Sequence, residues 1–293
     1  VDVNTIYDVP NHMYRECLDK VALIKLKLKY NEPDLDSWNN FLDKYKNPKD
    51  TIKIALIGKY VELQDSYKSI LESFIHAGAV NEVDVDIIPL HSEFINSENV
   101  HDKLQSFNGI LVAPGFGERG VEGKIEAIKY VRLNNIPFFG ICYGMQMAVI
   151  EYARNMLKLD DANSTEVNPN TKNPVIDLME EQKNITEKGG TMRLGSQVCN
   201  LKKGSKMAKL YKKAKISERH RHRYEFNNNY TDRIFDDKFV IAGSNPDTKL
   251  VEIVENIDHP WFVGVQFHPE YQSTVKNPHP LFVSFVEACK KTI

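Results

Sequence analysis

Residues 137–153, PFFGICYGMQMAVIEYA, join a short apolar run to a longer segment in which apolar residues recur at helical spacing. Cys142 lies at the junction, with one glycine two positions before it and another two positions after it. A buried structural cysteine needs neither glycine. A cysteine at the tip of a tight strand-to-helix turn needs both, because the sheet and the helix approach each other closely there. The stretch therefore predicts a strand, a sharp turn that presents the thiol, and a helix.

The same alternation of short apolar runs and helical patterns extends on both sides of this stretch. The expected strands are 51–60, 83–90, 109–115 and 136–141, and the expected helices are 66–78, 97–107, 121–135 and 144–157. Ser66 is the expected cap of the first of these helices, and Gly78 is its expected end. Such alternation is typical of a parallel sheet with helical crossovers.

The second half of the chain is richer in strand patterns. They occur at 239–244, 249–256 and 261–267, and a final helical pattern follows at 280–291. We therefore predict an α/β fold with a central, mostly parallel sheet flanked by helices, and with an additional β-rich portion in the second half.

Residues 1–50 have a different pattern, which predicts a helix within 13–30, a short second helix and a linker, without a core of their own. We divide the chain into this segment and one domain over residues 51–293. The first residue is Val1 rather than methionine, so we expect a fragment of a longer protein.

The bulk composition is that of an ordinary protein of the cytoplasm. The 293 residues carry 38 basic and 40 acidic side chains, a net charge of −2, which favours neither nucleic acid nor an anionic membrane as a partner. No apolar run is long enough to span a membrane, and the first residues lack the pattern of a signal peptide. Four widely spaced cysteines are typical of a reducing compartment.

Cys142 is the candidate nucleophile. The N-terminus of the helix that follows it carries a partial positive charge, which favours the thiolate. The N–H of Tyr143 is free in the first helical turn, so it can donate to an oxyanion. A structural role for Cys142 stays open on this pattern alone. For Cys17, Cys199 and Cys289 the structural role is the better interpretation.

A candidate base follows the last predicted strand. His268, Pro269 and Glu270 come directly after it, and in an extended chain residues two apart point to the same side. Glu270 could then fix the tautomer of His268 while the other ring nitrogen faces the site, as in a nucleophile–base–orienter triad. His259 and His279 also precede proline, so the dipeptide by itself is a weak signal.

Two further segments could carry a site. The glycine-rich stretch 111–124 fails as a phosphate loop, because Glu118 and Ile125 stand where glycine and serine or threonine are required. Its backbone could instead line an oxyanion hole.

The stretch 216–228 holds alternating histidines and arginines. Since no third ligand lies nearby, we predict no metal site there, and an arginine that clamps a carboxylate is the better functional use. The lysine-rich stretch 201–215 is expected to be a solvated face.

Together these motifs resemble a known family. GICYGMQ (140–146) and FHPE (267–270) resemble the class I, triad-type glutamine amidotransferases. PGFGERGVEGKIEAI (114–128), DANSTE (161–166), GGTMRLG (189–195) and RHRHRYEFNN (219–228) are similar to the glutaminase domain of the CTP synthase family. The resemblance covers about residues 51–290 and implies a flavodoxin-like, three-layer fold. Residues 1–50 resemble the end of that family's synthetase domain and its linker.

The resemblance also implies roles for individual residues. Cys142 would be the nucleophile, His268 the acid and base, and Glu270 its orienter. The positions that bind glutamine and form the oxyanion hole would be Gly115, Tyr143, Gln146, Glu166 and Arg223. The sequence departs from the family at Pro114, which has no N–H, at Tyr143, where leucine is usual, and at Val167, where phenylalanine is common.

In that family, ammonia from L-glutamine aminates UTP to CTP in a synthetase domain that uses ATP and Mg2+, with GTP as activator, in a homotetramer. For this chain the resemblance implies no cofactor, no CTP synthesis on its own, and low glutaminase activity. Two alternatives stay open: another Cys–His–Glu hydrolase of γ-glutamyl substrates, and a non-catalytic regulatory module on the same fold.

Overall fold

The apolar runs predicted as strands pair in one large sheet. The computed structural model describes residues 2–178 and 192–293. The strands of the large sheet in these ranges are β1 (Asp50–Gly58), β2 (Val83–His91), β3 (Gly109–Val112), β4 (Phe138–Ile141), β7 (Arg193–Leu201), β8 (Lys215–His222), β10 (Phe239–Ser244), β11 (Val251–Asn256) and β12 (Phe262–Val265). Their order in the sheet is β2-β1-β3-β4-β12-β11-β10-β7-β8.

The direction of pairing changes at β12. From β2 to β12 neighbouring strands are parallel, and from β12 to β8 they are antiparallel. The predicted β-rich portion is therefore a continuation of the central sheet. A smaller sheet joins β5 (Asn163–Ser164), β6 (Pro174–Leu178) and β9 (Tyr224–Phe226) at its side.

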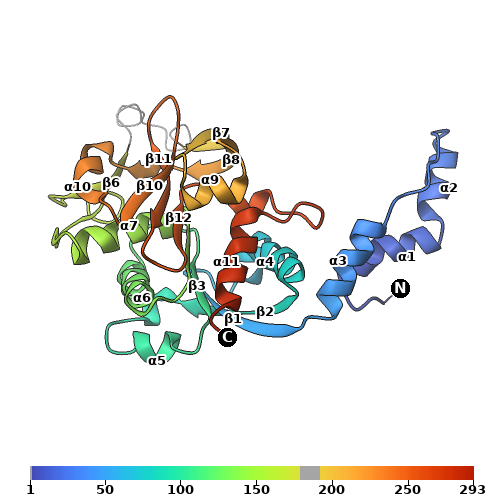
Figure 1. Cartoon of the computed structure of the whole chain (residues 1–293), viewed down its shortest axis with the longest axis horizontal. Coiled ribbons are helices and arrows are strands. Elements are labelled where there is room, and N and C mark those ends of the chain that lie inside the picture. Colours follow the sequence, from blue (N-terminus) through green and yellow to red (C-terminus); the bar gives the residue numbers. More distant parts are fainter. Residues whose placement is uncertain (1, 179–191) are drawn as a thin grey trace.

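Helices cover both faces of the large sheet, as predicted (Figure 1). One face carries α5 (Val100–Leu104), α6 (Val121–Asn134) and α7 (Tyr143–Asn155), and the other carries α4 (Lys68–Asn81), α9 (Lys206–Tyr211) and α11 (Pro280–Lys290). The alternation of β1 divides the core between them: Ala55 and Ile57 pack with the first group, and Ile54 and Leu56 with the second. The short α10 (Thr231–Ile234) lies beyond the β9 strand.

The prediction for the ends of α4 was wrong. The helix begins at Lys68, after a 3₁₀ helix at Gln64–Tyr67, and continues past Gly78 to Asn81, so Ser66 does not cap it. A Cβ on Gly78 would lie 2.8 Å from the carbonyl oxygen of Val83. Glycine is thus needed there for close packing of the helix on the next strand, and its position does not mark a helix end.

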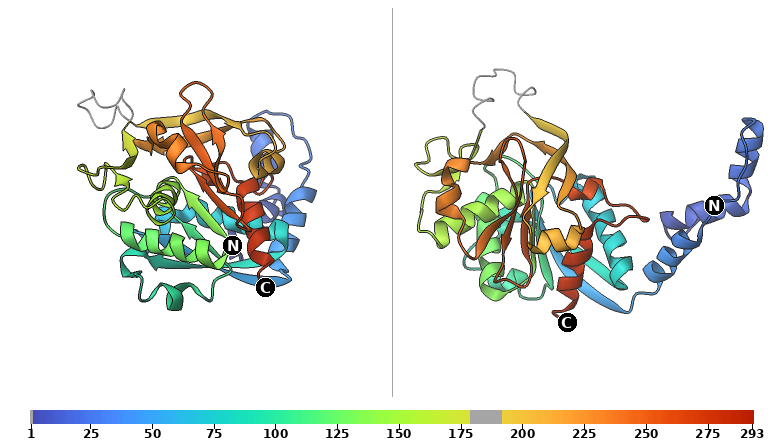
Figure 2. Two further views of the ribbon diagram at one scale, coloured as in Figure 1. Left: turned by 60° about the vertical axis from the view of Figure 1, so that its left-hand side comes forward. Right: turned by 45° about the horizontal axis from the view of Figure 1, so that its top comes forward.

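The N-terminal segment extends away from the sheet as an arm (Figure 2). It contains α1 (Val9–Arg15), α2 (Leu18–Lys25) and α3 (Asp36–Lys46). The single helix predicted within 13–30 is broken at Cys17, whose φ is +55°. The arm does share a small cluster with the domain, because Tyr7 and Phe41 pack against Ala79 of α4. No helix in the described part of the chain is long and apolar enough to cross a membrane.

Candidate active site

The predicted strand-to-helix turn is present at Cys142. β4 ends at Ile141, α7 begins at Tyr143, and Cys142 between them has φ +53° and ψ −100°. Its N–H donates to the carbonyl of Val265 at 2.7 Å, which ties the turn to β12. A non-glycine residue with positive φ is strained, and such strain is typical of a nucleophile held at the tip of a turn. The side chain is buried at the N-terminus of α7.

The two glycines beside Cys142 are explained by the approach of α7 to the sheet. A Cβ on Gly144 would lie 2.3 Å from the carbonyl oxygen of Val112 in β3. A Cβ on Gly140 would lie 2.7 Å from the carbonyl carbon of Gly144. Both contacts are with backbone, which cannot rotate away, so only glycine fits at either position.

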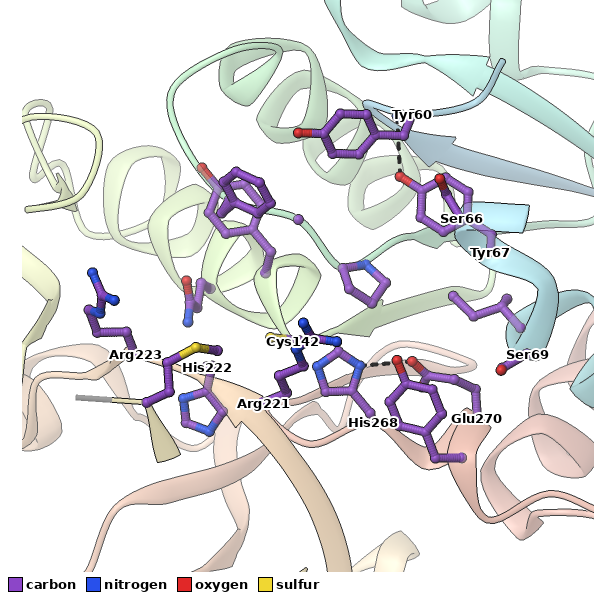
Figure 3. A pocket seen from close by; sticks show the side chains of 18 of the residues that line it. Tyr60, Ser66, Tyr67, Ser69, Cys142, Arg221, His222, Arg223, His268 and Glu270 are labelled. Carbon is purple, nitrogen blue, oxygen red and sulfur yellow. Dashed lines mark hydrogen bonds and ion pairs between the residues drawn. The ribbon is translucent and has the colours of Figure 1, made fainter. Parts of the chain in front are cut away.

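His268 and Glu270 meet Cys142 because β12 and β4 are parallel neighbours whose carboxyl ends lie side by side. Nδ1 of His268 and Oε1 of Glu270 are 2.8 Å apart. Nε2 of His268 is buried without a hydrogen-bond partner among the described residues. Figure 3 shows Cys142, His268 and Glu270 together in the pocket. The sequence prediction of this convergence is confirmed.

The reason given for the His268–Glu270 contact was wrong. The backbone there is not extended, because Pro269–Tyr271 form a 3₁₀ helix that starts directly after His268. This turn, and not the alternation of a strand, brings the carboxylate of Glu270 back to the imidazole. Pro269 suits the first position of the turn, where its fixed φ is an advantage and no N–H is needed.

The electrostatics of this group favour a charged imidazole. Burial alone would lower the pKa of His268, but the sulfur of Cys142 and the carboxylate of Glu270 together raise it well above its usual value. A proton is therefore held on His268 near neutral pH, beside the sulfur. A charged imidazole at this position can serve a cysteine nucleophile as its acid.

Gln266 is a site residue that the sequence reasoning missed. Its side chain is fully buried, and its Nε2 lies 3.6 Å from Sγ of Cys142. Its Oε1 accepts from Nε2 of Gln146 at 3.2 Å, and that same nitrogen donates to the carbonyl of Tyr224 at 2.7 Å. A polar residue inside the apolar run 261–267 was the available signal. The predicted glutamine contact Gln146 thus also fixes the amide beside the nucleophile.

All the predicted site residues line one pocket with a volume of about 680 Å³: Cys142, His268, Glu270, Gly115, Tyr143, Gln146, Glu166 and Arg223. Other lining residues were given no role in the site, although Met192 and Arg221 lie within quoted motifs; they include Tyr60, Tyr67, Lys68, Ser69, Met192, Arg221 and Tyr271. They come from the segment after β1, the 3₁₀ turn and first residues of α4, the residue before β7, the strand β8 and the 3₁₀ turn after His268, so only the three-dimensional fold brings them to the site. Of the GGTMRLG motif, residues 189–191 lie outside the described residues.

The glycine-rich loop after β3 forms one side of the pocket. The N–H of Gly117 donates to Oε1 of Glu166 at 3.1 Å, and the hydroxyl of Tyr143 donates to the carbonyl of Gly117 at 2.5 Å. Burial raises the pKa of Glu166, against the opposing effects of this N–H and of Arg223. An acidic and a basic side chain therefore face the same cavity.

The histidine-rich strand β8 forms a buried polar network at one wall of the pocket, which Arg221 and His222 line. Its residues alternate between buried and exposed, and Nδ1 of His220 lies 2.9 Å from Nε2 of His222. Burial lowers the pKa of both imidazoles, that of His222 to about 3. Arg193 bridges Glu225 at 3.2 Å and Glu252 at 2.7 Å. In the described ranges no group of three or more metal-ligating side chains is arranged to hold a metal ion.

Comparison with known proteins identifies the family. The family model for glutamine amidotransferase class-I matches residues 62–288. The chain belongs to the class I glutamine amidotransferase family. This confirms the resemblance noted in the sequence and agrees with the observed fold.

Within this family the chain is similar to CTP synthases. That of Flavobacterium johnsoniae is 62% identical over 289 residues, which are 98% of this chain and 54% of that protein. That of Clostridium kluyveri is 52% identical over 288 residues, with the same coverage. A solved Trypanosoma brucei CTPS glutaminase domain with bound acivicin is 39% identical, with a TM-score of 0.77, and the match covers 82% of this chain and 94% of that one. The chain spans about half the length of the curated relatives it matches.

Proposed function

We propose that this domain hydrolyses L-glutamine to glutamate and ammonia through a thioester on Cys142. The observation that carries the proposal is the meeting of Cys142, His268 and Glu270 at the carboxyl ends of two neighbouring parallel strands. Membership of the glutamine amidotransferase family supports the substrate class.

The chemistry divides into two half-reactions. The Cys142 thiolate attacks the side-chain amide carbon of glutamine, and the backbone N–H groups of Gly115 and Tyr143 stabilise the oxyanion. His268 gives its proton to the departing ammonia, and the thioester remains. His268 then takes a proton from water, which attacks the thioester and releases glutamate. Loss of one oxyanion donor typically costs about 10²–10³ in rate.

Substrate recognition uses the two charged residues of the pocket. Glutamine carries an α-ammonium and an α-carboxylate, and Glu166 and Arg223 match these charges. Pro114 offers no N–H, but Gly115 after it does, so the departure from the family's glycine leaves that donor available. Because both α-groups are recognised, we expect free glutamine to be preferred over γ-glutamyl peptides.

The complete protein is proposed to be a CTP synthase of the cytoplasm, acting as a homotetramer. There the ammonia would pass to a synthetase domain for the amination of UTP, with ATP and Mg2+, and GTP would activate the glutaminase. The described chain would need that domain for CTP synthesis. We expect its unstimulated glutaminase activity to be low for the same reason.

The test combines turnover with covalent labelling. Cys142→Ala should abolish ammonia release from glutamine, and an electrophilic glutamine analogue should add once to the wild-type chain, at Cys142, by mass spectrometry. Wild-type turnover by Cys142→Ala would refute the mechanism. A preference for γ-glutamyl peptides would favour the other hydrolase, and an inert thiol would favour a regulatory module.

A further inference from the structure

We propose that the Tyr143 hydroxyl positions the oxyanion hole by anchoring the glycine-rich loop. The inference rests on the proposed function and adds a positioning residue to it. The starting observation is that one residue reaches both sides of the site. Its backbone N–H lies at the start of α7, next to Cys142, and its side chain donates to the Gly117 carbonyl at 2.5 Å.

The loop needs such an anchor. Residues 113–120 have no helix or strand. Gly117 has φ +75°, and glycine can leave this conformation for many others at little cost. Ala113 is fixed by its N–H bond to the carbonyl of Ile57 at 2.9 Å. Further along, Lys59 reaches the carbonyl of Phe116 only at 3.5 Å, from an exposed position. At the centre of the loop, the bond that Gly117 accepts from Tyr143 and the bond that it donates to Glu166 are both shorter than this lysine contact. Arg119 pairs with Glu93 at 3.0 Å near the end of the loop.

The Tyr143 ring is itself held firmly. It is 2% exposed, and Nζ of the buried Lys124 lies 5.7 Å from its centroid. Lys124 is in turn fixed by Oγ of Ser92 at 3.0 Å. Burial raises the pKa of the Tyr143 hydroxyl, so the hydroxyl remains a hydrogen-bond donor throughout the pH range in which the domain would work. A leucine at this position could fill the space but could not hold the loop.

Gly117 also connects the loop to substrate recognition. Its N–H occupies Oε1 of Glu166, the carboxylate proposed to receive the α-ammonium. Its carbonyl is held by Tyr143, so the backbone on both sides of Gly117 is fixed. The same loop carries Gly115, whose N–H is the proposed oxyanion donor. The hydroxyl of Tyr143 therefore sets the distance between the N–H groups of Gly115 and Tyr143. Glutamine bound at Glu166 reinforces this conformation of the loop.

The decisive variant is Tyr143→Phe, which removes only the hydroxyl. A net hydrogen bond of ordinary strength predicts a fall in kcat of about 3- to 10-fold for glutamine and for an activated γ-glutamyl ester. Alkylation of Cys142 by iodoacetamide forms no oxyanion, so its rate should not change. The matched control is Tyr152→Phe, which loses a 2.6 Å bond to Asp236 away from the pocket and should keep the wild-type kcat.

The outcomes separate this inference from the proposed function. A wild-type kcat in Tyr143→Phe, with both substrates, would overturn the inference alone. Equal losses in turnover and in alkylation would also overturn it, because they indicate general disorder of the site. If the wild-type chain is alkylated but turns over neither substrate, the proposed function fails and the inference fails with it.

Discussion

Replacing Gly144 by alanine should damage the domain, although the same change at an open helical position is stabilising. The added Cβ would lie 2.3 Å from the carbonyl oxygen of Val112 and 3.1 Å from its carbonyl carbon. The usual carbon–oxygen distance in such contacts is about 3.3–3.6 Å. Helix α7 would therefore have to move about 1 Å away from β3, and the N–H of Tyr143 would move with it.

The size of the effect follows from two opposing contributions. Forcing an extra methyl into a packed core costs about 1–3 kcal/mol. The better helix propensity of alanine returns at most about 1 kcal/mol. A net loss of up to about 2 kcal/mol in the free energy of unfolding remains. A displacement of about 1 Å in a catalytic group can cost about 10²-fold in rate, so turnover should fall far more than stability.

The assay pairs denaturant unfolding with glutamine turnover, and Gly204→Ala is the control. Gly204 has φ +84°, and an added Cβ there would meet nothing within 4 Å. Strain from the left-handed conformation should cost about 1–2 kcal/mol, yet leave turnover unchanged. If Gly144→Ala keeps wild-type stability and turnover, the explanation of the glycines around Cys142 is wrong.

Two further predictions concern titrating groups. Glu270→Gln should lower the pKa of His268 in an NMR titration and reduce kcat by at least about tenfold; an unchanged titration would contradict the role given to Glu270. Because folding raises the pKa of His268, the contribution of His268 to the free energy of unfolding is complete below about pH 6.5. This contribution is lost as the pH rises through the pKa of His268 in the folded state, and Glu270→Gln should lose part of it. Burial raises the pKa of Glu225 to about 8, so its contribution is complete below about pH 4.5 and lost as the pH rises through about 8. Glu225→Gln should flatten the decline of the free energy of unfolding between about pH 5 and pH 8, where one such group contributes a slope of up to about 1.4 kcal/mol per pH unit; the same slope in both proteins would contradict the raised pKa of Glu225.

The features that could be predicted from the sequence depend on local patterns. The turn at Cys142 is specified by two glycines and a change of apolar period within seventeen residues. His268 was found because it follows an apolar strand directly. Their convergence then follows from a general property of parallel sheets, in which sites form at the carboxyl ends of strands.

The features that were missed depend on contacts between distant segments. The continuation of the sheet from β12 to β8 requires the pairing register of strands, which no single segment encodes. Gly78 was misread because its partner is the carbonyl of Val83 in the following strand. The 2.8 Å contact of His268 and Glu270 was predicted, but the 3₁₀ turn that creates it could not be distinguished from an extended chain around Pro269.

The pairing of β4 with β12 also separates the positioning of the reacting residues from the recognition of the substrate's end group. Between β4 and β12 the chain forms β7, β8, β10 and β11 of the same sheet, together with the connections that carry Glu166 and Arg223. Cys142 is tied to the end of β12 by its N–H bond to Val265, and His268 is tied to β8 by its N–H bond to the carbonyl of Arg219 at 2.8 Å. The connection that carries Glu166 is not part of these contacts, so it could be remodelled to accept a different substrate end group while the reacting pair keeps its geometry.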